Sequence, residues 1–314
     1  MRAARPPTPE VTAVSGVRGR IRHTRGTVVV IALALALVVS GSPLAANAAK
    51  PTSHPGGGTT GEPAIPKGMA AAGDSISIAT NHSLTCTIFG GCTSRSWTTG
   101  SNTTVDSHFL RLRDYNSRLT TRNAAFSGAK MESLDGQFTR ILANNYRPGY
   151  VTVLIGANDI CGPRLTESLT ETADFKTQFQ TAMNNLYLLS PNTSVFVASI
   201  PDLERLYGLM RPNNTAVNTW AQYGVCPHML TAGIDRTPAQ LRQGELNAVL
   251  KEVCESFVTA TPTLPNRCRY DGGAVFNTDF VAADVSTVDY FHPSAAGQNK
   301  LSRIAWEKSF WPTR

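Results

Sequence analysis

The sequence has no apolar run long enough to cross a membrane as a helix. The run VVVIALALALVV at 28–39 has 12 residues, whereas a spanning helix needs about 20. Six arginines lie in the first 25 residues, and the small residues Ala46-Asn47-Ala48 follow the run. This pattern predicts a secretory signal peptide over 1–48. No Arg-Arg pair precedes the run, and no cysteine directly follows it to accept a lipid. We therefore expect the protein to be released outside the cell by the general secretory route.

The rest of the chain lacks a strong excess of charge. The whole sequence has a net charge of +7, and residues 1–48 contribute +5 from six Arg and one Glu, which leaves about +2. Without a basic stripe, we expect no nucleic-acid partner. Residues 49–65 are rich in Pro, Gly and Thr and predict a flexible leader. Their G-x-G-x-x-G pattern has no strand before it, which excludes a dinucleotide site. Residues 66–314 show no repeat and predict one domain, which we expect to be a monomer.

No two of the six cysteines are spaced as C-x-x-C, and no pair of histidines lies nearby. This absence argues against a zinc site, and we expect no metal. An even number of cysteines in a secreted chain predicts disulfides, and six cysteines allow 15 connectivities. Pairing of sequence neighbours is the simplest of these: Cys86–Cys92, Cys161–Cys226 and Cys254–Cys268.

Beyond residue 66, short apolar segments alternate with longer ones whose apolar residues recur at helical spacing. Strands made only of small or apolar residues are typical of parallel sheets covered by helices on both faces. We therefore predict a three-layer α/β/α sandwich with a mainly parallel, flavodoxin-like five-stranded sheet. The predicted strands are 68–73, 122–128, 150–156, 194–200 and 274–280. The predicted helices are 107–119, 131–145, 174–190, 237–258 and 294–310.

Polar residues follow the predicted strands at the edge where parallel sheets bind ligands. Ser75 lies at a turn and an expected helix start after the first strand, Gly128 follows the second and Asn158 follows the third. Asp289 and His292 directly precede the last helix. Each residue alone could have an ordinary role, such as a helix cap or a tight turn. Together they supply the hydroxyl, base, carboxylate and hydrogen-bond donors that acyl transfer by a serine requires.

The order of these motifs resembles that of the SGNH (GDSL) hydrolases, from Ala72 to about Trp306. The G-x-S-x-G motif of the α/β-hydrolases is absent. The resemblance implies Ser75 as nucleophile, His292 as general base and Asp289 as the residue that orients the imidazole. It also implies an oxyanion hole formed by the backbone N–H groups of Ser75 and Gly128 and the side chain of Asn158. Such an enzyme hydrolyses carboxylic esters through an acyl-enzyme and needs no cofactor.

Four segments are similar to the secreted phospholipase-B-like and lipase branch of that family. They are SRSWTTGSN at 94–102, FSGAKMESL at 126–134, GANDIC at 156–161 and SIPDLERLYGL at 199–209. The likeness implies an acyl ester of a lipid as substrate, met at a lipid surface. Two alternatives stay open. The same residues could serve an esterase for small acyl groups, such as acetyl on a carbohydrate. A secreted binding module could also keep the fold without turnover.

Overall fold

The described part of the chain is an α/β fold built on one parallel sheet. The computed structural model describes residues 62–313 except 85, 87–90, 262 and 264–266, so the predicted signal peptide lies outside the described residues. The sheet has the order β2-β1-β3-β4-β5, and every pairing is parallel. This confirms the predicted flavodoxin-like architecture. The strands are β1 (Gly68–Gly73), β2 (Thr120–Asn123), β3 (Tyr150–Leu154), β4 (Ser194–Val197) and β5 (Cys268–Tyr270).

β1 matches its prediction, and β3 and β4 begin where predicted but end earlier, at Leu154 and Val197. The other two predicted strands differ more. β2 lies at the edge of the sheet and ends at Asn123, so residues 124–128 form the loop that follows it. The fifth strand predicted at 274–280 is wrong, because β5 lies at Cys268–Tyr270. The Asp271 side chain accepts the N–H groups of Gly273 and Val275, at 2.8 and 3.0 Å, and this turns the chain directly after β5. Val275, at the end of that turn, is a β-branched residue of the kind that strands favour, and this makes the segment resemble a strand in the sequence.

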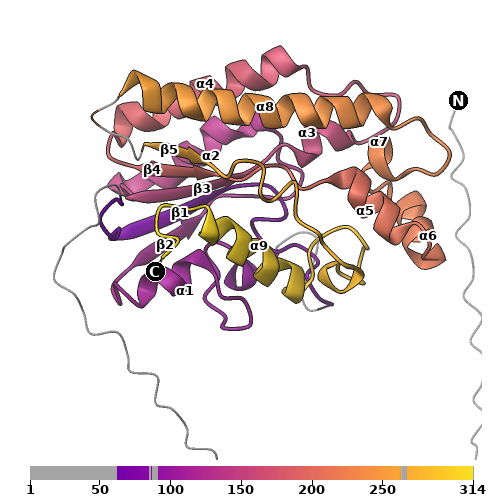
Figure 1. The fold of residues 1–314 in the computed structure, drawn as a ribbon, viewed down its shortest axis with the longest axis horizontal. Coiled ribbons are helices and arrows are strands. Elements are labelled where there is room, and N and C mark those ends of the chain that lie inside the picture. The colour runs from indigo at the N-terminus through magenta and orange to yellow at the C-terminus, as the bar shows by residue number, and fades with distance from the viewer. Residues whose placement is uncertain (1–61, 85, 87–90, 262, 264–266, 314) are drawn as a thin grey trace, which may run out of the picture. The chain divides into compact units, whose positions relative to one another are not determined.

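Helices cover both faces of the sheet, as Figure 1 shows. α2, α4 and α8 lie on one face, α1 and α9 lie on the other, and α5, α6 and α7 gather beyond the carboxyl ends of the strands. The helices are α1 (His108–Arg113), α2 (Leu134–Leu142), α3 (Ala157–Cys161), α4 (Thr172–Leu189), α5 (Leu203–Met210), α6 (Asn214–Tyr223), α7 (Pro227–Leu230), α8 (Thr237–Ala260) and α9 (Ala295–Glu307).

A separate apolar core fills each side of the sheet. On the first side, α4 presents a single stripe at helical spacing, in which Phe175, Phe179 and Leu186 are fully buried. On the other side, the core is rich in aromatic rings and includes Trp97 and Trp306. Both cores pack on the sheet, in which β1, β3 and β4 are buried at every position, so the sheet is held between them. That packing fixes the positions of the loops that leave its carboxyl edge.

Three disulfides join cysteines that are neighbours in the sequence, which is the simplest pairing. They are Cys86–Cys92, Cys161–Cys226 and Cys254–Cys268. Cys161–Cys226 links α3 to the start of α7 and closes the longest loop, with a sequence separation of 65. A loop of this length corresponds to about 4 kcal/mol of stabilisation through the unfolded chain.

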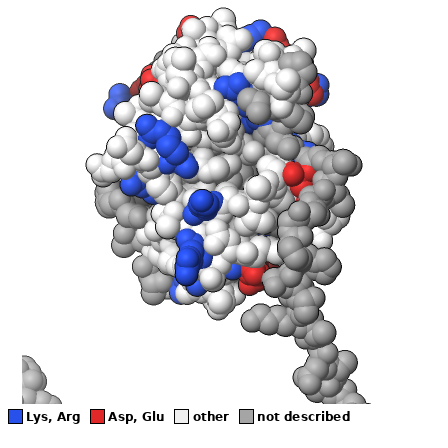
Figure 2. Space-filling model, turned by 90° about the vertical axis from the view of Figure 1, so that its left-hand side faces the viewer, with Lys and Arg blue, Asp and Glu red and all other residues white. Residues whose placement is uncertain are grey.

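The chain enters the sheet at the amino ends of the strands. Residues 62–65, which the sequence assigns to the flexible leader, contact the domain: Trp311 Nε1 donates to the carbonyl of Pro63 at 2.8 Å. Figure 2 shows the face at this end, where lysine and arginine side chains are separated by uncharged surface. Among the residues that the structure describes, no helix is long and apolar enough to span a membrane.

Candidate active site

The candidate residues lie near the point in the sheet where the strand order reverses. β1 lies between β2 and β3, so the loops that leave these three strands are neighbours at the carboxyl edge. Ser75 follows β1, Gly128 follows β2 and Asn158 lies in α3 directly after β3. Ligands of doubly wound sheets bind at this switch point. The topology therefore places the residues from three loops at one edge.

The turn that carries Ser75 depends on a glycine. Gly73 has φ +147°, and a Cβ built there would lie 2.2 Å from the carbonyl oxygen of Leu154. Gln137 holds both backbone groups of Gly73, at 2.6 and 2.9 Å. The expected helix start after Ser75 is absent, because residues 75–80 form turns. The N–H of Ile76 is accepted by the side chain of Asp74 at 2.9 Å, which stabilises the turn at Ser75.

His292 and Asp289 form a hydrogen-bonded pair. Nδ1 of the imidazole lies 2.5 Å from Oδ2 of Asp289. The other carboxylate oxygen accepts the backbone N–H groups of Phe291 and His292, both at 3.0 Å. Burial acts to raise the pKa of Asp289, but the charge and hydrogen bonds of His292 and the amide of Asn81 hold that pKa below its usual value. Asp289 is therefore suited to stay ionised beside the ring.

The second ring nitrogen of His292 is poised to act. A carboxylate only accepts hydrogen bonds, so Nδ1 donates and Nε2 keeps its lone pair. Nε2 is buried and has no hydrogen-bond partner among the described residues. The side chain of His292 is 13 % exposed, and Ser75 is 6 % exposed. An imidazole oriented in this way can take up a proton at Nε2 and return it.

Two loops supply groups that could donate to an oxyanion. Gly128 has φ +78° and nothing within 4 Å of the position of a Cβ, so the backbone is open there. Asn158 Nδ2 donates to the carbonyl of Ala129 at 3.0 Å, which uses one of its two hydrogens. Asp159 accepts the N–H of Met131 at 3.1 Å and ties the same two loops together. The loops after β2 and β3 are thus fixed to each other.

Two buried carboxyl groups lie beneath these loops. Burial raises the pKa of Asp74 to about 7 and that of Asp159 to about 6. One oxygen of Asp74 accepts the N–H of Ile76, and the other is buried without a partner among the described residues. The charge of His292 lowers the pKa of Asp74, and that of Asp159 raises it. Neither aspartate is assigned a role by the reasoning from the sequence.

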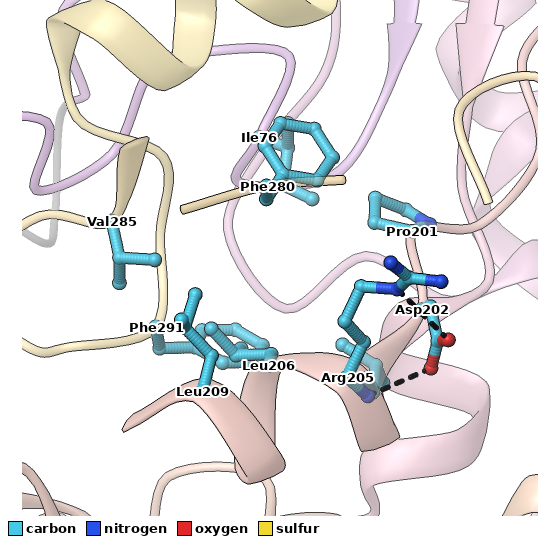
Figure 3. Close-up of a pocket in the computed structure, with 10 residues that line it drawn as sticks. Ile76, Pro201, Asp202, Arg205, Leu206, Leu209, Phe280, Val285 and Phe291 are labelled. Atoms are coloured by element: carbon cyan, nitrogen blue, oxygen red, sulfur yellow. Dashed lines mark hydrogen bonds and ion pairs between the residues drawn. The ribbon is translucent and has the colours of Figure 1, made fainter. Parts of the chain in front are cut away.

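An apolar pocket is lined in part by the chain neighbours of Ser75 and His292 (Figure 3). Ile76 follows the serine, Phe291 precedes the histidine, and both line the pocket. Leu206 and Leu209 extend from α5 toward Phe291, and the pocket has a volume of about 60 Å³. Its other lining residues are Pro201, Asp202, Leu203, Arg205, Phe280 and Val285.

The two charged residues of the lining are paired. Arg205 lies 3.7 Å from Asp202 and also forms an ion pair with Asp279. Its guanidinium is therefore matched by two carboxylates, and the interior of the pocket is apolar. Within the described ranges, no group of three or more His, Cys, Asp or Glu residues is arranged to hold a metal ion.

Comparison with protein families gives one match over most of the chain. Residues 71–300 match the GDSL-like lipase/acylhydrolase family. That range contains Ser75, Gly128, Asn158, Asp289 and His292. No curated protein matches the chain.

The solved structures to which the chain is similar are distant in sequence. An α/β hydrolase from the metagenome of Lake Arreo, Spain, is 14 % identical with a TM-score of 0.49, over 79 % of this chain and 96 % of that one. An acetylxylan esterase from Geobacillus stearothermophilus is 14 % identical with a TM-score of 0.47, over 77 % and 93 %. A putative GDSL-like lipase from Parabacteroides merdae is 14 % identical with a TM-score of 0.42, over 77 % and 94 %. At these values the likeness carries no argument about this chain.

Proposed function

Because the chain belongs to the GDSL-like lipase/acylhydrolase family, a family of carboxylic ester hydrolases, we propose that it is a secreted enzyme that cleaves acyl esters of lipids through an acyl-enzyme on Ser75. The observation that carries this proposal is the His292–Asp289 pair, with Nδ1 2.5 Å from the carboxylate and Nε2 without a partner. A purely structural histidine needs no such arrangement. It is the arrangement that a general base requires.

The reaction has two halves. Nε2 of His292 takes the proton of Ser75 while the serine oxygen attacks the ester carbonyl, and the tetrahedral oxyanion forms. His292 then gives that proton to the leaving alcohol, which leaves an acyl group on Ser75. Water gives a proton to the same nitrogen as it attacks the acyl ester, and His292 then passes that proton to the oxygen of Ser75 as the bond to the acyl group breaks and the carboxylic acid leaves. Asp289 stays ionised throughout and stabilises the imidazolium.

The oxyanion would be held by donors from three loops. These are the backbone N–H groups of Ser75 and Gly128 and the second hydrogen of the Asn158 amide. The loops after β2 and β3 are already joined by the Asn158 and Asp159 hydrogen bonds. Donors that are fixed before the reaction stabilise the developing charge without a cost of reorganisation.

The apolar pocket supports a lipid acyl group as the substrate. A volume of about 60 Å³ has room for about four or five groups of the size of water. The pocket would therefore hold the first carbons of an acyl chain, and the rest would lie along its open mouth. Each buried methylene contributes about 0.8 kcal/mol, or about fourfold in kcat/KM. An enzyme for acetyl groups gains nothing from such a pocket.

The test is a series of p-nitrophenyl esters from acetyl to palmitoyl. We expect kcat/KM to rise from acetyl to hexanoyl, to persist with longer chains, and to vanish in Ser75→Ala. Leu206→Trp fills the pocket from α5 and should lower kcat/KM for hexanoyl while sparing acetyl. Leu188→Trp makes the same change on α4 at a side chain that is 79 % exposed, and it should alter neither substrate.

Two other outcomes would redirect the proposal. A maximum at acetyl that depends on Ser75 would favour the esterase for small acyl groups. A preparation with no turnover that depends on Ser75, at any chain length, would favour the binding module.

Secretion is a separate part of the proposal. It is supported by the predicted signal peptide at 1–48 and by three disulfides, which persist in oxidising compartments. Expression of the full chain with analysis of the culture medium tests it. We expect a released protein that begins near residue 49, and retention of the intact chain inside the cell would contradict secretion.

A further inference from the structure

One side chain outside the known motifs contacts the carboxylate of the pair. Asn81 Nδ2 donates to Oδ2 of Asp289 at 2.8 Å, and the same oxygen accepts Nδ1 of His292. Asn81 is only 3 % exposed. Two side-chain donors therefore converge on one oxygen, while two backbone N–H groups hold the other. This set leaves the carboxylate no freedom to turn away from the imidazole.

Asn81 also holds the backbone of the loop that carries the pair. Its carbonyl accepts the hydroxyl of Ser286, and the N–H of Ser286 donates to the carbonyl of His292 at 2.8 Å. Asn81 lies six residues after Ser75 in the same run of turns. Asn81 thus joins the segment that carries Ser75 to the loop that carries His292.

The backbone at this position suits asparagine. Asn81 has φ +51°, a left-handed conformation that asparagine and glycine adopt far more readily than other residues. Asn81 contacts Asp289, which in turn contacts His292, and the next residue in the chain is His82, which contacts Arg95 at 2.9 Å. Aspartate in place of Asn81 would put a second carboxylate beside Asp289, with the same shape and an ionisable group.

We propose that Asn81 is a positioning residue of the active site, which holds the Asp289 carboxylate against His292 and fixes the segment of Ser75 to the loop of the histidine. This inference rests on the proposed function, because it assigns Asn81 a part in the same reaction. Asn81 would touch neither substrate nor the reacting atoms. It would act by keeping the acceptor of the imidazole in place.

Three variants of the full chain test the proposal. Asn81→Gly removes the amide without strain at a positive φ, and kcat should fall about tenfold to a hundredfold with KM unchanged. Asn81→Asp should keep activity while the two carboxyl groups share a proton, and lose it as the pH rises and that proton leaves. The control is Asn116→Gly, which removes a side chain that donates to Pro66 at 2.9 Å, at the amino ends of the strands. Its kcat should stay within twofold of the wild type.

A second readout does not depend on turnover. The Nδ1 proton of a histidine bound to a carboxylate gives a strongly downfield proton NMR signal. We expect this signal in the wild type and in Asn116→Gly, and its loss or shift in Asn81→Gly. Thermal unfolding of each variant checks that it is folded when its kcat and NMR signal are compared with those of the wild type.

The outcomes separate this inference from the proposed function. If Ser75→Ala keeps the activity, the proposed function fails, and the NMR signal still tests Asn81. An unchanged kcat and an unchanged signal in folded Asn81→Gly would overturn the positioning role. A loss in Asn81→Gly without a new alkaline decline in Asn81→Asp would assign the effect to loop packing and would overturn it as well.

Discussion

His108 and His292 occupy two regions of the molecule that use the same side chain in opposite ways. His108 is fully buried in the aromatic core, where Trp97 and Trp306 pack edge-on at 5.2 Å, and its Nδ1 contacts the hydroxyl of Tyr150 at 2.9 Å. Burial, aided by the charge of Arg111, lowers the pKa of His108 to about 3. This histidine stays neutral and serves the packing of α1 against the sheet.

His292 differs because a carboxylate accompanies it. Asp289 accepts its Nδ1, and the loop that carries both residues directly precedes α9. An ionised partner makes a positive imidazole tolerable, which is what a ring that takes up and returns a proton requires. The comparison teaches that the partner of a histidine, rather than burial alone, decides whether it can act as a base.

The sharpest test of this comparison, with the largest expected effects on kcat and on stability, is to remove the imidazole of each histidine. His292→Ala should lower kcat by at least about 10⁴ and leave the free energy of unfolding nearly unchanged. His108→Ala should leave the kcat of the folded enzyme within twofold. Its free energy of unfolding should fall by about 2–4 kcal/mol, through the cavity and the unpaired Tyr150 hydroxyl. Hydrolysis rates and urea unfolding of both variants make the measurement, and equal kcat losses would break the comparison.

The next effect concerns the donors that face the substrate. Asn158→Ala removes the amide that is expected to donate to the oxyanion, and kcat should fall about 10²–10³-fold with little change in KM. Asn185→Ala is the matched control, because its amide donates to Asp135 on the surface at 3.0 Å. A kcat for Asn158→Ala that equals the control value would remove Asn158 from the oxyanion hole.

The smallest effect is a pH dependence of stability with opposite signs in the two regions. Asp74 has a folded pKa of about 7 against an ordinary 3.8, so the folded state binds its proton more tightly. Its contribution to stability is full below about pH 4 and is lost as the pH rises through 7. Asp74→Asn keeps the acceptor for Ile76 and should be more stable than the wild type at pH 8, by at most about 4 kcal/mol.

His108 contributes in the reverse direction. Its pKa of about 3 lies below the ordinary 6.5, so the stability tied to the neutral ring is present above pH 6.5 and is lost as the pH falls toward 3. Urea unfolding of wild type and Asp74→Asn at pH 5 and pH 8 separates the two contributions. A stability difference between them that is the same at both pH values would show that Asp74 is ionised throughout.

The elements of the fold can be predicted from the sequence where burial leaves a clear pattern of apolar residues. β1 and β3 are buried at every position because helices cover both faces, and the periodic stripes of α4 and α8 pack into the same core. β5 escaped prediction because it has only three residues, Cys268–Tyr270, and two of them are half-buried. The turn set by Asp271 then made the segment after it look like a strand.

The site divides in the same way. The candidate residues Ser75, Gly128, Asn158, Asp289 and His292 can be proposed from the sequence because each stands at a fixed place after a strand or before the last helix. Asn81 cannot, because it is one asparagine in an irregular run of turns and its partner is 208 residues away in the sequence. The pocket cannot be predicted either, because only the fold brings Leu206 and Leu209 of α5 to face Phe291.

The most direct test of the proposed mechanism is to trap the acyl-enzyme. The protein is mixed with a slowly hydrolysed p-nitrophenyl ester, quenched in acid and digested, and the peptides are weighed by mass spectrometry. We predict one acyl group on the peptide that carries Ser75, and none in Ser75→Ala or His292→Ala. An acyl group on another residue, or rapid turnover with Ser75 never modified, would contradict the assignment of Ser75 as the nucleophile.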